Sequence, residues 1–206
     1  MTIFNEGGLR AEIKCLADEV STLPSRGKAT VFAVCGRGLA PLLDLVETRT
    51  YGQWVFPEAQ AAIAKVENYV LGRSAGQDHA ALRGRLMGSV PHGHDLDSPW
   101  STYAQAALTC IDAGLAASSV VDSCKGIWIQ YSLDPLVGSL QYRDEDILIS
   151  RGEGVWEREI LADHSITSAF KFLRKVVHSV QCEVPLPEVR YSELTEEAVV
   201  LIPAIH

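Results

Sequence analysis

The chain has 206 residues, of which 47% are hydrophobic and 21% are charged. This composition supports one packed core and excludes disorder of the whole chain. The formal net charge is −8, with 18 lysines and arginines against 26 aspartates and glutamates. Because phosphate neutralisation supplies most of the affinity of nucleic-acid binders, this balance disfavours nucleic acid as a partner.

The N-terminal residues 1–6 contain neither a basic start nor an apolar run of signal-peptide length. No apolar run approaches the roughly 20 residues of a membrane-spanning helix. We therefore expect a cytoplasmic protein that does not enter a membrane. The five cysteines are scattered and form no Cys-x-x-Cys pair, which predicts reduced thiols in a reducing compartment.

Apolar residues recur at helical spacing through most of the chain. Leu9, Ile13, Leu16 and Val20, for example, follow steps of four, three and four residues and share one helix face. Pro41 is expected to kink or bound the second helix. The pattern predicts helices around 9–20, 31–45, 57–71, 78–87, 99–115, 121–131 and 166–180. A helix is also expected to begin at the acidic residues 144–146, but Gly152 and Gly154 interrupt the pattern before Trp156 and Ile160.

The C-terminal part of the sequence has a different pattern. Pro185, Pro187 and Pro203 preclude a long helix there, and the β-branched residues of 198–202 favour a strand. We therefore predict an all-α fold, a multi-helix bundle of about seven to nine helices with a short extended C-terminal tail. Residues 1–182 are expected to form the helical domain, and residues 183–206 a tail packed on the domain or on a partner.

The short motifs in the sequence do not indicate a catalytic or phosphate-binding site. Gly36 and Gly38 flank an arginine in the nearest approach to a glycine-rich loop, but they lie in a helical pattern with no strand before it. We interpret them as a close contact between two helices. Asp163 precedes His164 between two helices, where a cap for the helix beginning at Ser165 is the plainer role. We expect His79 and His178 at exposed or edge positions of helices.

One loop contains residues of the types that bind transition metals. His92, His94 and Asp95 bring two imidazoles and a carboxylate together, which would suit a metal-dependent hydrolase with help from the Asp163–His164 pair. Stable structural sites, however, usually draw ligands from two places in the chain, and no second cluster stands out. A polar loop that caps the helix beginning near Pro99 is the favoured interpretation. We therefore expect no metal, no cofactor and no catalytic residue.

The stretch from Asp144 to Asp163 is strongly acidic. It holds seven acidic residues against two arginines, a balance of −5, and a tryptophan lies among them. A solvated helix face explains much of this charge. An aromatic anchor inside an acidic field is also typical of a surface that captures a basic protein. The candidate partner-binding residues are Asp144, Glu145, Asp146, Trp156, Glu157 and Glu159.

Four stretches of the chain are similar to the YjaG-type family of bacterial all-helical proteins, a domain of unknown function. They are Phe4-Asn5-Glu6 with Leu9 and Ile13, Ala33-Val34-Cys35-Gly36-Arg37, Ser101-Thr102-Tyr103-Ala104-Gln105-Ala106-Ala107, and Glu157-Arg158-Glu159-Ile160-Leu161-Ala162-Asp163-His164. The resemblance implies an all-α fold and brings no established activity. The proline-containing segment after Glu183 is an addition to the family pattern.

Two classes of function follow from these features. The first is a protein-binding module that is not an enzyme: an immunity-type protein that neutralises a basic partner, such as a toxin domain, by occluding it. Its support is the negative charge, the acidic stretch with its tryptophan, and the lack of a catalytic motif. The alternatives are the metal-dependent hydrolase of the His92 loop and a housekeeping helical protein of unassigned function.

Overall fold

The computed structural model describes residues 8–91, 99–143 and 153–204. Over these ranges the chain forms nine α-helices and two 3-10 helices, with no strand. The predicted all-α bundle of about seven to nine helices is therefore confirmed. The elements are α1 (Gly8–Ser21), α2 (Ser25–Arg49), α3 (Pro57–Val70), α4 (Ala80–Gly88), α5 (Trp100–Ala117), η1 (Gly126–Ser132), α6 (Asp134–Arg143), α8 (Glu153–Ala162), α9 (His164–Cys182), α10 (Glu188–Glu197) and η2 (Ala198–Leu201).

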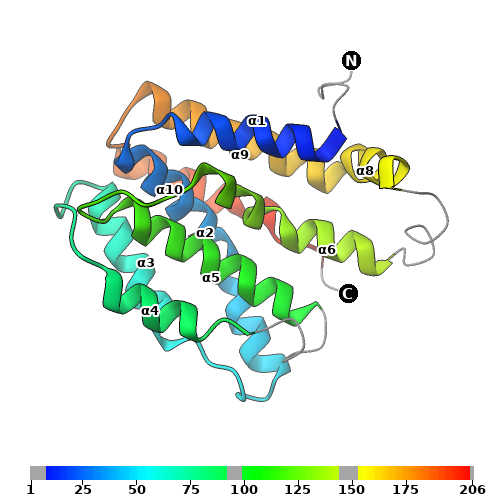
Figure 1. Cartoon of the computed structure of the whole chain (residues 1–206), viewed down its shortest axis with the longest axis horizontal. Coiled ribbons are helices and arrows are strands. Elements are labelled where there is room, and N and C mark those ends of the chain that lie inside the picture. The colour runs from blue at the N-terminus through cyan, green and yellow to red at the C-terminus, as the bar shows by residue number, and fades with distance from the viewer. Residues whose placement is uncertain (1–7, 92–98, 144–152, 205–206) are drawn as a thin grey trace.

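Helix α2 is the central element of the bundle. It packs most extensively on α5 and also contacts α3, α9, α10 and η2. In Figure 1 it runs between α1 and α9 on one side and α3, α4 and α5 on the other. Its length and its mean hydropathy of 1.5 would suffice to span a membrane, but 78% of that stretch is buried inside the protein. Such burial is typical of the core helix of a bundle.

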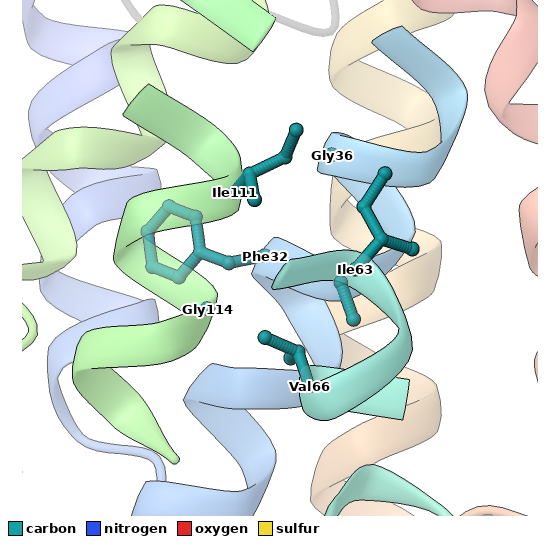
Figure 2. Close-up of a pocket in the computed structure, with 7 residues that line it drawn as sticks. Phe32, Gly36, Ile63, Val66, Ile111 and Gly114 are labelled. Carbon is teal, nitrogen blue, oxygen red and sulfur yellow. The ribbon is translucent and has the colours of Figure 1, made fainter. Parts of the chain in front are cut away.

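Two glycines of α2 lie where neighbouring elements approach closely. A Cβ atom at Gly36 would lie 3.0 Å from Cγ1 of Ile111 in α5, and one at Gly38 would lie 3.0 Å from the carbonyl oxygen of Ala198 in η2. This confirms the close helix contact predicted for the two glycines. Gly36 also lines an apolar cavity of about 10 Å³ between α2, α3 and α5 (Figure 2). Ligand pockets span roughly 300–1,000 Å³, so this cavity is a packing defect.

Two expectations about helix boundaries are wrong. The boundary that was one of the two alternatives for Pro41 is absent, because α2 continues from Ser25 to Arg49. Pro41 is exposed, so the carbonyl that it leaves without a helical partner can be hydrated.

The helix expected over 121–131 is also replaced, by an extended segment and the 3-10 helix η1. Ser118 and Ser119 do not cap a new helix, because their hydroxyls donate back to the carbonyl of Leu115 at 3.1 and 2.8 Å. Asp122 instead accepts from Lys28 Nζ at 3.0 Å, which fixes the extended segment to α2.

The C-terminal segment is helical where an extended tail with a strand was expected. Pro187 stands directly before α10, at a position where its missing N–H costs no hydrogen bond. The prolines thus limit the length of this helix without preventing it. Tyr191 and Leu194 of α10 and Leu201 of η2 are buried in the common core. The segment therefore packs on α2 and α9 as part of the bundle.

Candidate functional site

The structure places part of the predicted acidic surface. Asp144, Glu145 and Asp146 lie outside the described residues, and Trp156 lies in α8 with a side chain that is also outside them. Glu157 is half-buried, and its Oε1 lies 3.2 Å from Nε of Arg10 in α1. Glu159 is exposed on the same helix.

Its charge thus partly balanced, Glu157 contributes to the contact between α8 and α1. Because Arg10 is exposed, this ion pair contributes little to the free energy of unfolding, about 0–1 kcal/mol. Among the predicted partner-binding residues whose side chains the structure describes, Glu159 is the exposed one.

The predictions for the histidines have different outcomes. His92, His94 and Asp95 of the predicted metal loop lie outside the described residues. Asp163 caps α9 as expected, because its Oδ1 accepts the N–H of Ser165 at 2.8 Å. His79 is 5% exposed, so the expectation of an exposed or edge position is wrong for it. Burial lowers the pKa of His79, and the nearby Lys65 lowers it further.

No group of three or more histidine, cysteine, aspartate and glutamate side chains is placed to hold a metal within the described ranges. The acidic and apolar surfaces are therefore the features that the structure offers for a site.

The outer face of α10 and η2 carries exposed valines and glutamates together. Val189 is 72% exposed and Val199 is 65% exposed. Glu193 and Glu196 are exposed between them, at spacings that keep all four residues on one helical stripe. We call these four residues the α10 stripe. The α10 stripe was not predicted, because an extended tail was expected here. The helical spacing of four and three residues from Val189 to Glu193 and Glu196 is nevertheless present in the sequence.

The inner face of α10 is fixed to the bundle by a polar contact as well as by its core residues. Tyr191 is buried, and its hydroxyl donates to Oε1 of Glu67 at 3.2 Å. Arg37 Nε lies 3.4 Å from the same oxygen. Burial and the neighbouring Glu67 raise the pKa of Tyr191, so the hydroxyl stays a donor. The stripe is therefore presented by a helix that is anchored on its opposite face.

The negative charge of the molecule is concentrated in the last third of the chain. Residues 144–206 hold twelve acidic against six basic residues, a balance of −6. Residues 1–143 hold fourteen against twelve, a balance of −2. Both the predicted acidic stretch and the α10 stripe belong to the more acidic part. Net negative charge of this kind favours the approach of positively charged groups.

A groove of about 460 Å³ lies beside the connection from α5 to η1. Val120 and Val121 on its rim are 74% and 77% exposed. On its lining, Arg83 Nε and Nη2 donate to Asp112 at 2.7 and 2.9 Å, and Nη1 donates to Ser123 at 3.1 Å. Because Asp112 balances the charge of Arg83 and raises its pKa, the pair attracts neither anions nor cations strongly. The lining also contains Asp78, Ser119 and Ser123, so the groove combines apolar and polar side chains.

No family model, no curated protein and no solved structure matches this chain. The similarity to the YjaG-type family stays a prediction. Function is therefore inferred from the chain's own surface.

Proposed function

We propose that this chain is a protein-binding module that captures a basic partner protein. As an immunity-type protein it would neutralise a basic toxin domain by covering it, in the cytoplasm. The observation that carries the proposal is the concentration of negative charge in residues 144–206, together with exposed valines on the α10 stripe. Acidic side chains steer a basic partner toward the surface, and exposed apolar side chains bury area once it arrives.

The ion pairs along α10 do not prevent this role. Glu193 lies 2.9 Å from Arg190, and Glu197 lies 2.6 Å from Lys175, but all four side chains are substantially exposed. Exposed pairs of this kind contribute about 0–1 kcal/mol, so their glutamates can exchange an internal partner for an external one at little cost. Burial of the flanking valines, Val189 and Val199, against a partner contributes about 25 cal/mol for each Å² of apolar surface removed from water.

The proposal is tested with the protein encoded by the neighbouring gene as the candidate partner. The two proteins are co-expressed, and association and dissociation rates are measured with the purified pair at several salt concentrations. The Glu193→Lys/Glu196→Lys variant should associate roughly tenfold more slowly and with a flatter salt dependence. Circular dichroism checks that the fold is unchanged.

A matched control separates local steering from total charge. Asp18 of α1 and Asp44 of α2 are exposed, and the Asp18→Lys/Asp44→Lys variant changes the net charge by the same four units. We expect a smaller loss of association rate for this control. Equal effects of the two variants would argue against a binding surface at α10, and absence of any complex would argue against this partner.

A further inference from the structure

The outer face of α9 carries an exposed histidine and an exposed cysteine one helical turn apart. His178 and Cys182 are four residues apart, which places both on the same face of the helix. Nε2 of His178 lies 3.7 Å from Sγ of Cys182. Both residues are exposed, so their facing atoms are accessible from solvent.

This distance matches the geometry of a shared metal ion. In a tetrahedral zinc site the metal–sulfur bond is about 2.3 Å and the metal–nitrogen bond about 2.05 Å. At the tetrahedral angle these bonds place sulfur and nitrogen about 3.5–3.6 Å apart. The observed separation of 3.7 Å is within a few tenths of an ångström of that value. The separation of the two atoms, which is also that of a hydrogen bond between them, is therefore compatible with a cation bonded to both.

We propose that His178 and Cys182 form a two-ligand site for a thiophilic divalent cation of the zinc class. On binding, the thiol proton passes to solvent and the thiolate sulfur donates an electron pair to the metal. The histidine donates its Nε2 lone pair and keeps its proton on Nδ1. Water fills the two remaining corners of the tetrahedron. Thiolate and imidazole ligands select zinc-like cations over magnesium and calcium, which prefer oxygen.

The surroundings of the pair tolerate a cation. Ser179, the residue after His178, accepts a hydrogen bond from Nη2 of Arg190 at 3.2 Å. The charge of Arg190 is balanced by Glu193, whose Oε2 lies 2.9 Å from Nη1. Glu183, which follows Cys182, is exposed and adds negative charge. The site goes beyond the proposed capture of a protein and does not depend on it.

The test uses cobalt(II), which substitutes for zinc and absorbs strongly in the near ultraviolet when a thiolate binds it. Reduced, full-length protein without a polyhistidine tag is titrated with cobalt chloride under anaerobic conditions. We expect a sulfur-to-cobalt band that saturates at one metal per chain and disappears when zinc is added. The Cys182→Ser variant should lose the band, and His178→Gln should weaken cobalt binding by roughly tenfold or more.

Matched controls come from the other exposed cysteine and histidine. Cys15 is exposed but faces Glu19 at 3.6 Å in place of a histidine, and His164 is exposed with Ser168 as its neighbour. The variants Cys15→Ser and His164→Gln should keep the band. A His92→Gln/His94→Gln variant should keep it too, because that loop supplies no sulfur. Absence of a band, its survival in Cys182→Ser, or its loss in Cys15→Ser would overturn the proposal.

Discussion

Asp134, the first residue of α6, is a carboxyl whose ionisation opposes folding. Burial raises its pKa from the ordinary value of 3.8 to about 6. The folded protein therefore binds this proton more tightly than the unfolded chain does between about pH 4 and pH 6. Stability falls as pH rises through this window and stays lower above it.

The Asp134→Asn variant should therefore be more stable than the parent protein at pH 7.5. We expect a gain of about 1–2 kcal/mol at that pH, because the amide removes the buried charge. At pH 4 the parent carboxyl is protonated in the folded state, and the two proteins should differ little. Urea unfolding at both pH values measures the difference. A gain of the same size at both would show that ionisation is not its cause.

Gly38 and Gly84 are both helical glycines with opposite surroundings. A methyl group at Gly38 would lie 3.0 Å from the carbonyl oxygen of Ala198, whereas nothing lies within 4 Å of one at Gly84. We expect Gly38→Ala to cost about 1–3 kcal/mol through overpacking. Gly84→Ala should gain about 0.5–1 kcal/mol from helix propensity. Chemical denaturation of both variants tests this, and a gain at Gly38 would contradict the close contact with η2.

At the scale of elements, α10 has one face that holds the fold and one that is free for other contacts. Leu194 on the inner face is completely buried, whereas Val189 on the outer face is 72% exposed. We expect Leu194→Ala to lower the free energy of unfolding by about 2–5 kcal/mol. Val189→Ala should change it by less than about 0.5 kcal/mol. Urea unfolding measures both, and a large effect of Val189→Ala would mean that the stripe belongs to the core.

The helices that the sequence predicts well are those with a continuous apolar stripe. In α1, α3 and α9 the three-to-four spacing reports burial directly, because each helix buries one face against the bundle, whereas α5 is buried on nearly all sides. The helices over residues 188–201 were not predicted, because Pro187 was expected to preclude a long helix. A proline is also common directly at the start of one. The segment before η1 was missed because its serine hydroxyls bond backward to Leu115 and its aspartate bonds to α2.

The candidate sites depend on how distant elements pack, and sequence spacing reports that only in part. The four-residue step from His178 to Cys182 is visible in the sequence, but its exposure follows from which face of α9 the core covers. His79 shows that a polar residue can share such a face, since it precedes Leu82 and Leu86 by three and seven residues and is buried with them. The sequence did predict the acidic character of the chain, because charge is additive and independent of fold.

For the whole molecule, the charge asymmetry leaves two acidic regions as candidates for first contact with a basic partner. The predicted region contains Asp144, Glu145 and Asp146, and the other is the α10 stripe. Charges at the rim of an interface act mainly on the rate of encounter and are screened by salt. Reversal of the three residues to lysine should slow association and flatten its salt dependence. Unchanged kinetics for this triple variant, with slowed kinetics for Glu193→Lys/Glu196→Lys, would assign first contact to α10.

Trp156 tests a different property of the same surface, namely whether it has an apolar anchor. A tryptophan at the centre of an interface typically contributes about 2 kcal/mol or more to affinity. If Trp156 is such an anchor, Trp156→Ala should increase the dissociation rate by the corresponding factor of roughly 30 and leave the unfolding midpoint nearly unchanged. If the side chain packs within the bundle, the same variant should lose about 3–5 kcal/mol of stability. The free energy of unfolding and the dissociation rate, measured on one preparation, distinguish an interface anchor from a core residue. If neither quantity changes in Trp156→Ala, Trp156 does not belong to the binding surface.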